Sequence, residues 1–318
     1  MSDGRIDVHS HFLPDFYREA ATAAGHAQPD GIAGLPAWTA AGHVAMMDRL
    51  GIATSLLSIS SPGVHFGDDG AARDLARQVN EEGHRAAEAH PGRFGLFAAL
   101  PAPDVDGALA EIRYCYDRLG VDGVALLTNA GGTYLGDPAL EPVFDELDRR
   151  HARVFVHPTS PACWENTSLG RPRPMIEFLF DTTRAVVNLV LNGTVARHPG
   201  IEFVIAHAGA ALPVIADRVA AFTMILTDVD GEADVMRDLA RLHYDLAGFP
   251  VPRQLDAILA LTTLEHLHYG SDYPFTPEFV VEMGTRALAG AGDPAGSVAG
   301  ALAANTRRLF PASRILPA

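Results

Sequence analysis

Lysine is absent from this chain of 318 residues, so all 24 of its basic residues are arginine. The 39 acidic residues outnumber them, and the formal net charge at neutral pH is −15. Nucleic acids and anionic membrane surfaces attract proteins that present a basic surface. The charge balance therefore argues against a nucleic acid or a membrane as a partner.

Cysteine and long apolar runs are also scarce. The two cysteines, Cys115 and Cys163, are too few for a disulfide framework. No apolar run approaches the length that a helix needs to span a bilayer. Strand-like sequence begins at Arg5, and nothing before it has the pattern of a secretory signal. These absences predict a cytoplasmic protein without a membrane segment.

Short apolar runs that alternate with helical patterns dominate the rest of the chain. Apolar residues make up 48% of the sequence, which is enough for a sizeable core. The runs are rich in Val, Ile, Leu and Phe, and the amphipathic segments between them indicate helices. We expect eight strands, at residues 5–11, 53–60, 94–100, 122–128, 152–157, 202–208, 242–247 and 267–272.

The alternation of strands and helices predicts an α/β fold, a closed (β/α)8 or TIM barrel. Strands that alternate with helices run parallel and are joined by right-handed crossovers. Eight such units in a chain of this length are typical of the barrel. The alternative is an open doubly wound sheet, which would need a glycine-rich phosphate-binding turn after the first strand. Phe12, Leu13 and Pro14 occupy that turn instead.

We expect one domain over residues 1–318, because the chain shows no repeat, low-complexity block or linker. Two long connections lie outside the eight units. Residues 13–38, rich in Ala, Gly and Pro, predict a loop or small excursion over the barrel mouth. Residues 158–174 contain many prolines and predict either a lid or dimer contact, or a surface loop without a special role.

Two histidines end the first strand. Side chains alternate between the faces of a strand, so His9 and His11 point to one side and Ser10 to the other. Two imidazoles on one face form a clamp for a divalent metal ion. Two polar core residues with satisfied hydrogen bonds are the alternative interpretation.

Three further polar residues end later strands. His157, His207 and Asp272 each follow a hydrophobic run, where a buried polar group costs free energy unless it is satisfied. The active sites of such barrels are built at the carboxyl ends of the strands. The convergence of five such residues at one end of the barrel therefore predicts a metal site.

Other polar residues near the barrel mouth allow two interpretations. His65 follows the second strand and could reach the mouth. Asp245, on the seventh strand, either supports a metal ligand or is a buried core carboxylate with backbone partners. The remaining histidines, which include His43, His198 and His268, are expected in surface or capping roles.

Four motifs carry a resemblance to a known family: IDVHSHFLP, VFVHPTSP, AHAGAALP and YGSDYPF. They resemble the amidohydrolase superfamily, in the branch of aminocarboxymuconate-semialdehyde decarboxylase. The stretches that are most similar to 6-methylsalicylate decarboxylases are YLGDPALEPVFDELDRRHARVFVHPTSP and TTRAVVNLVLNG. The resemblance extends from Ile6 to about Phe310.

The resemblance implies a metal-dependent, non-oxidative decarboxylase. Its substrate would be a small carboxylic acid that is aromatic and salicylate-like, or unsaturated. A mononuclear metal-dependent hydrolase of a lactone or an amide uses the same ligands and is the alternative enzyme. A non-catalytic binding barrel is the alternative from another class, and the intact ligand set argues against it.

By the same resemblance, four residues bind one divalent metal ion: His9, His11, His157 and Asp272. Three imidazoles and one carboxylate suit Zn²⁺, and the set also accepts Mn²⁺, which some relatives use. Binuclear relatives bridge two metal ions with a carboxylated lysine at the end of the fourth strand. This chain has no lysine, which favours a single metal ion.

The resemblance also implies catalytic and substrate-binding residues. His207 corresponds to a histidine that orients or deprotonates water at the metal, and Asp272 could also shuttle a proton. Phe275 aligns with an aromatic residue that lines the substrate site. Arg218 aligns with an arginine that relatives insert into the neighbouring subunit, which implies a homodimer; a solvated helix residue is the alternative. Residues 19–48 contain no arginine, which disfavours aminocarboxymuconate as the substrate.

Overall fold

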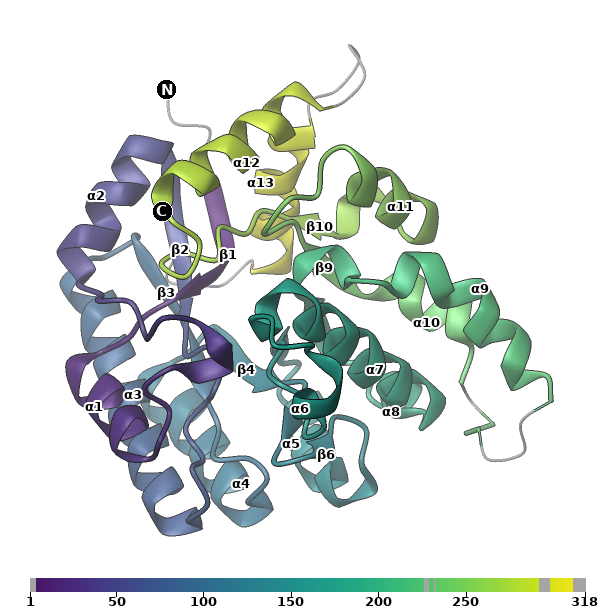
Figure 1. Cartoon of the computed structure of the whole chain (residues 1–318), viewed down its shortest axis with the longest axis horizontal. Coiled ribbons are helices and arrows are strands. Elements are labelled where there is room, and N and C mark those ends of the chain that lie inside the picture. Colours follow the sequence, from purple (N-terminus) through teal and green to yellow (C-terminus); the bar gives the residue numbers. More distant parts are fainter. Residues whose placement is uncertain (1–3, 226–228, 232, 292–297, 311–318) are drawn as a thin grey trace.

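Eight parallel strands form the centre of the molecule in the computed structural model (Figure 1), which describes residues 4–225, 229–231, 233–291 and 298–310. Neighbouring strands pair in the order β1-β2-β3-β4-β7-β8-β9-β10. Their bounds are β1 Arg5–His11, β2 Ile52–Ser58, β3 Phe94–Ala99, β4 Gly123–Leu127, β7 Arg153–His157, β8 Glu202–Ile205, β9 His243–Asp245 and β10 Leu267–His268. These strands coincide with the eight predicted runs to within a few residues.

The sheet closes between its first strand and the segment that follows its last strand. The amide of Val8 donates to the carbonyl of Tyr269 at 2.9 Å, and the amide of His11 donates to the carbonyl of Tyr273 at 2.8 Å. Parallel bridges join the same two segments. The prediction of a closed barrel is therefore confirmed, and the open doubly wound sheet is excluded.

Helices cover the outside of the barrel and follow the strands in sequence (Figure 1). Their bounds are α1 Asp15–Ala23, α2 Ala40–Leu50, α3 Asp69–Ala89, α4 Val105–Tyr114, α5 Glu141–Arg149, α6 Trp164–Thr167, α7 Glu177–Leu191, α8 Thr194–Arg197, α9 Leu212–Thr223, α10 Val235–Arg241, α11 Arg253–Leu261, α12 Glu278–Gly290 and α13 Val298–Leu309. Local chemistry sets several ends. Asp68 and Asp104 accept backbone amides as N-caps of α3 and α4, and Gly51 ends α2 with φ of 68°. None of the described helices is long and apolar enough to cross a bilayer.

The core has two parts. The larger part lies between the strands and the helices, and a smaller cluster contains strand residues together with the end of α13. In this smaller cluster the rings of Phe97 and Phe155 stack at 5.5 Å, and Phe310 packs edge-on against Phe97. The ring of Phe155 also contacts that of His9 at 4.9 Å. The packed barrel interior therefore supports a side chain of the predicted metal site directly.

The two long connections contain more structure than the sequence suggested. Residues 13–38 include α1, whose Tyr17 and Ala21 are fully buried, and a short 3₁₀ turn at Pro29–Gly31. Residues 158–174 include the four-residue α6. Short helices with one or two buried anchors lack the long apolar repeat that identifies a helix from sequence. The predicted domain over 1–318 extends beyond the described residues and stays a prediction.

The expected surface or capping roles are wrong for His43 and His268, which are fully buried. His198 is nearly buried but does cap a helix: it ends α8, and its Nδ1 bonds to the carbonyl of Thr194 at 2.9 Å. His43 accepts the indole N–H of Trp38 at 2.9 Å, and its Nε2 has no hydrogen-bond partner among the described residues. His268 is a core histidine whose two ring nitrogens contact His243 and Thr306, both distant in sequence.

Candidate metal centre and active site

A bulge in β1 sets the direction of its two histidines. Asp7 pairs with Ser55 and Ser10 with Leu57, so three steps along β1 face two steps along β2. The buried carboxylate of Asp7 fixes the bulge, because it accepts the amide of His9 at 3.1 Å and the amide and hydroxyl of Ser271 at 3.0 and 2.6 Å. Asp7 therefore stabilises both the bulge and the closure of the barrel.

Four side chains meet at the C-terminal mouth of the barrel. Each of His9, His11, His157 and Asp272 offers one ligand atom, and these atoms lie within 4.8 Å of one another. Oδ1 of Asp272 is 3.4 Å from Nε2 of His9 and 3.3 Å from Nε2 of His11. The structure thus brings together all four residues predicted as metal ligands.

Ring nitrogens in this group lack hydrogen-bond partners within the described part of the chain. Nε2 of His9, Nε2 of His11, Nδ1 of His157 and Nδ1 of His207 are all buried and unpaired. Four unsatisfied polar atoms would cost roughly 4–12 kcal/mol at about 1–3 kcal/mol each, which approaches the whole stability of a typical domain. Bonds to a cation would satisfy those that face the cluster, so the residues present fit a divalent metal ion.

Two neighbours fix the protonation of the β1 histidines. Nδ1 of His11 is 2.9 Å from the hydroxyl of Ser58, and that hydroxyl donates to the carbonyl of Ser10, so His11 must donate. Nδ1 of His9 is 2.9 Å from Oδ2 of Asp245 and donates to it. In the neutral imidazoles both Nε2 atoms then carry lone pairs that face the cluster. Asp245 therefore supports a candidate ligand, and it also has the backbone partners of the alternative interpretation, His207 and Ala247.

Electrostatics in the cluster favour a positive charge. Burial lowers the pKa of His11 and holds that of His157 well below its ordinary value, so both are neutral ligands at neutral pH. Burial also opposes charge on His9, but Asp245 and then Asp272 outweigh it and raise the pKa of His9 to about 10. Against the effect of burial, His11 and His9 hold the pKa of Asp272 well below its usual range. The two carboxylates thus stabilise a cation at this position.

His207 lies beside the cluster on a strained backbone. It follows β8 with φ of 56°, in the left-handed region, and its ring centroid is 5.0 Å from that of His9. The side chain of Gln254 donates to its carbonyl at 2.6 Å. Burial lowers the pKa of His207, so the neutral ring can accept a proton at neutral pH.

A cavity of about 600 Å³ opens above the cluster, and it is hereafter called the metal-site cavity. Its polar lining includes His157, His207 and Asp272, and its apolar lining includes the aromatic residues Phe178 and Phe275. The ring of Phe275 packs edge-on against His11 at 5.5 Å. Both long connections contribute to the wall, for example Ile32 and Pro174. This volume lies in the usual range of small-molecule sites and accommodates an aromatic acid.

Two candidate residues lie away from this cavity. Arg218 is exposed on α9, at the edge of the molecule in Figure 1, and its guanidinium lies 5.0 Å from the ring centroid of Phe222. It does not line the metal-site cavity of its own chain. His65 bonds to Asp69 at 2.8 Å and borders a different cavity.

Sequence reasoning missed several residues that shape the site. Ser58, Gln254 and Asp7 act through contacts that join distant strands, and single residues of these types carry no pattern. Gly270 is required because a Cβ at this position would lie 2.9 Å from the Cβ of His9. The sequence does show Gly270 two residues before Asp272, but only the closure of the barrel brings His9 next to it.

The fold and the cluster define a class of protein: a closed β/α barrel with a candidate metal site at the carboxyl ends of its strands. The chain belongs to the amidohydrolase family, whose model matches residues 6–312. It is 35% identical over 318 residues to a 6-methylsalicylic acid decarboxylase of Aspergillus aculeatus, covering 96% of both chains. The resemblance stated from the motifs is therefore confirmed.

Solved structures agree with this assignment. A crystal structure described as an amidohydrolase II superposes with a TM-score of 0.90 at 35% identity, covering 96% of this chain and 99% of the other. A dihydroxybenzoic acid decarboxylase from Polaromonas, solved with bound manganese and 2-nitroresorcinol, superposes with a TM-score of 0.82 at 17% identity, covering 97% of both chains. The second likeness shows the fold alone.

Proposed function

We propose that the protein is a metal-dependent decarboxylase of a small aromatic carboxylic acid, of salicylate type. The observation that carries the proposal is the cluster of His9, His11, His157 and Asp272 beneath a cavity lined by aromatic rings. The overall reaction converts an aryl carboxylate and one proton into the arene and carbon dioxide. The relative that is 35% identical over nearly its whole length bears the name of such an enzyme.

The cluster would hold one divalent cation through its three imidazoles and one carboxylate. The ion, when bound, supplies positive charge that binds a carboxylate and an adjacent hydroxyl group of the substrate. Three imidazoles suit Zn²⁺; Mn²⁺, which a structural neighbour contains, is compatible with the same ligands. The described chain contributes no lysine to bridge a second ion, since the whole sequence has none.

The residues of the chain would position the ring and move the proton. Phe275 and Phe178 flank the metal-site cavity and would hold an aromatic ring between them. Asp272 and His207 border the same cavity, and each has a lowered pKa. At neutral pH Asp272 is therefore ionised and the His207 ring is neutral, so His207 would take up a proton from solvent and pass it to the ring carbon that bears the carboxylate. Loss of carbon dioxide then restores the aromatic ring.

The activity is tested with metal-loaded protein and a panel of 6-methylsalicylate, 2,6-dihydroxybenzoate and simple aryl lactones. We expect carbon dioxide release from at least one of the two acids. In deuterium oxide, one deuterium should replace the carboxyl group in the product. We expect His207→Ala to lower kcat/KM by about a hundredfold or more. Acid release from the lactones without decarboxylation would instead establish a hydrolase.

The exposed face of α9 supports a homodimer. Val214 and Met224 are 80% and 85% exposed, and Phe222 is 43% exposed. Apolar side chains gathered on one exposed segment commonly mark a protein interface. We assign this face to a second copy of the chain, because Arg218 on the same helix aligns with an arginine that relatives insert into a neighbouring active site.

The state of the two cysteines accords with a reducing, cytoplasmic compartment, which we include in the proposal. Cys115 is a buried free thiol and Cys163 is an exposed free thiol. An exposed unpaired thiol persists most readily where cellular reductants keep it reduced. Fractionation of the source cells would check this location.

A further inference from the structure

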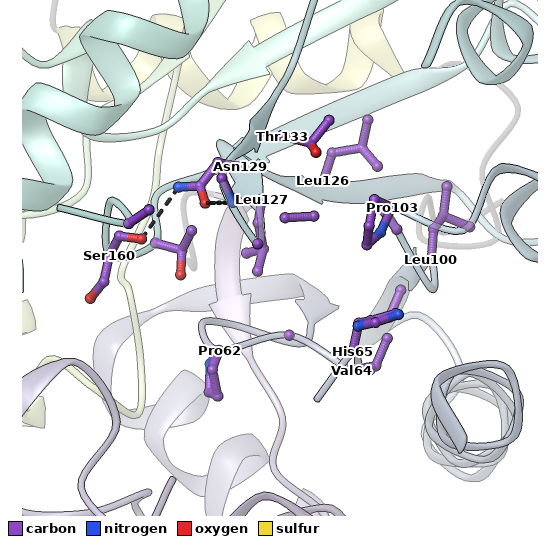
Figure 2. Close-up of a pocket in the computed structure, with 18 of the residues that line it drawn as sticks. Pro62, Val64, His65, Leu100, Pro103, Leu126, Leu127, Asn129, Thr133 and Ser160 are labelled. Atoms are coloured by element: carbon purple, nitrogen blue, oxygen red, sulfur yellow. Dashed lines mark hydrogen bonds between the residues drawn. The ribbon is translucent and has the colours of Figure 1, made fainter. Parts of the chain in front are cut away.

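A second cavity, drawn in Figure 2, is larger than the metal-site cavity and adjoins it at Asp30, which borders both. Its volume is about 890 Å³, against about 600 Å³ for the metal-site cavity. It is bordered by the ends of β3 and β4, by α4 and α5, and by the hairpin of β5 (Asn129–Ala130) and β6 (Thr133–Tyr134). None of the candidate metal ligands borders it, nor does His207. It is therefore a separate space and is hereafter called the side cavity.

A thin wall separates the two cavities. The hydroxyl groups of Ser61 and Thr159 are hydrogen-bonded at 2.7 Å; Ser61 borders the metal-site cavity, and Thr159 borders the side cavity. Asp30 borders both cavities and accepts the hydroxyl of Ser160. These contacts lie where the two cavities adjoin. No candidate metal ligand lines the side cavity, so a molecule confined to it would not touch them.

Apolar side chains form the depth of the side cavity. Leu100 and Leu126 approach from the ends of β3 and β4, as Figure 2 shows, and Val143 and Phe144 approach from α5. All four are buried, with exposures between 1% and 7%. Removing apolar surface from water is the dominant favourable contribution to binding in such a space. The deep part of the side cavity therefore favours a ligand whose body is apolar.

Two charged groups that border the cavity, Asp104 and Arg173, already have polar or ring contacts. Asp104 is bonded to Arg73, with Oδ1 2.8 Å from a terminal nitrogen of the guanidinium. Nε of Arg173 donates to the hydroxyl of Ser160 at 3.0 Å, and this guanidinium lies 4.1 Å from the ring centroid of Trp164. A charged ligand would lose its own water shell on entry and would compete with these contacts. The border therefore disfavours a charged ligand.

Two polar groups at the border of the side cavity can form hydrogen bonds with a polar atom of a ligand. The hydroxyl of Thr133, drawn in Figure 2, and the indole N–H of Trp164 have no hydrogen-bond partner among the residues that the structure describes. A hydroxyl group on the ligand could donate to Thr133 or accept from either group. A volume near 890 Å³ falls in the range of sites for ligands larger than one ring.

From these observations we propose that the side cavity is a binding site for an uncharged aromatic molecule of about two fused rings with one hydroxyl group. The site is distinct from the metal centre. The proposal does not rest on the decarboxylase activity, because it follows from the shape and polarity of the side cavity alone.

The probe is 6-bromo-2-naphthol, whose bromine scatters anomalously and whose hydroxyl group is neutral at pH 7. Crystals of the metal-loaded protein are soaked with this probe in the presence of saturating salicylate, which competes for the metal-site cavity. We expect an anomalous bromine peak in the side cavity. A peak in the metal-site cavity alone, or no peak together with no heat of binding in calorimetry, would overturn the proposal.

Two variants that fill the border test the location in solution. Thr133→Trp and Ala162→Trp place a large ring at the entrance, and Ala162 is exposed, so at least this second variant should fold. The matched control is Ala139→Trp, an exposed position outside the lining. We expect each filling variant to weaken probe binding at least tenfold and the control to change it less than twofold. Equal affinity in wild type and both filling variants would contradict the site. Neither readout requires turnover, so a failed activity assay would leave this result unaffected.

Discussion

Asp245 illustrates how one buried side chain serves both fold and site. Its Oδ2 accepts Nδ1–H of His9 at 2.9 Å, and its Oδ1 accepts the amides of Ala247 at 2.9 Å and His207 at 3.2 Å. One carboxylate thus orients a candidate ligand and the backbone of the proposed proton-transfer histidine. Such outer contacts orient the ligands of a metal site and contribute to its affinity.

We predict that Asp245→Asn weakens metal binding by about ten- to a hundredfold. The amide keeps the size of the carboxylate but no longer stabilises positive charge on His9. Affinity is measured by competition with a chromophoric chelator. Asp238→Asn is the control, because Asp238 is also a fully buried carboxylate but bonds to Arg237 on α10, outside the site. Unchanged affinity in Asp245→Asn would show that the contact is only structural.

His11 and His65 provide a second comparison at the scale of single residues. His11 belongs to the four-residue cluster, whereas His65 bonds to Asp69 and borders the side cavity. We predict that His11→Ala purifies with less than a tenth of the wild-type metal content, because one of three imidazole donors is lost. His65→Ala should keep the full content. Elemental analysis of dialysed protein gives both values, and retention of the metal by His11→Ala would refute the ligand assignment.

At the scale of elements, ion pairs within α5 and between α5 and the turn after α4 hold these segments together. Glu146 accepts Arg149 at 2.7 Å and Arg150 at 2.6 Å, and Arg150 reaches Asp117 in the turn after α4 at 2.8 Å. The hydrogen bonds from Arg149 lower the pKa of Glu146 to about 2, with Arg150 adding to the effect. The ordinary value for the unfolded chain is 4.5.

This lowered pKa predicts the direction of a pH effect on stability. The stabilising contribution of Glu146 is fully present above about pH 4.5 and is lost as the pH falls toward 2. We predict that Glu146→Gln lowers the melting temperature at pH 7 and that its difference from wild type shrinks toward pH 2. The control is Glu165→Gln, at an exposed position on α6. A constant difference across this pH range would contradict the assignment.

The position of Arg218 on α9 gives a prediction about the proposed dimer. Its guanidinium lies over Phe222 on the outer surface and does not line the metal-site cavity of its own chain. Mixed dimers of Arg218→Ala with His11→Ala contain one site that has both an intact cluster and an intact partner arginine. We expect such mixtures to recover part of the activity that each parent lacks. If the mixtures recover no activity, Arg218 does not act in the active site of the partner subunit.

At the scale of the whole molecule, the barrel interior joins stability to the site. Phe155 is fully buried, stacks on Phe97 and contacts the ring of His9. We predict that Phe155→Ala lowers the free energy of unfolding by about 3–5 kcal/mol, through lost burial and the remaining cavity. Urea denaturation measures the change. Phe279→Ala, at a position 65% exposed on α12, should stay within about 0.5 kcal/mol of wild type.

The barrel and the convergence of five strand-end residues follow from the sequence because strand ends repeat a simple pattern, whereas the choice of four metal ligands among them came from the family resemblance. His157 and Asp272 stand where hydrophobic runs stop, and parallel strands bring their carboxyl ends to one mouth. The bulge at Asp7 and the side cavity do not follow, because they arise from contacts between segments far apart in the chain. The burial of His43 is hidden for the same reason, since Trp38, Phe94 and Tyr273 enclose it only in the closed barrel.

The closure between β1 and the segment after β10 also bears on how the protein matures. The amide of Asp272 donates to the carbonyl of His9 at 2.8 Å, and this bond joins two candidate ligands that lie far apart in the sequence. A nascent chain on the ribosome presents His9 and His11 first and Asp272 only after the other seven strands have been synthesised. The full set of donors therefore exists only after translation has passed residue 272. Metal uptake should thus follow the synthesis of Asp272 and report closure of the barrel.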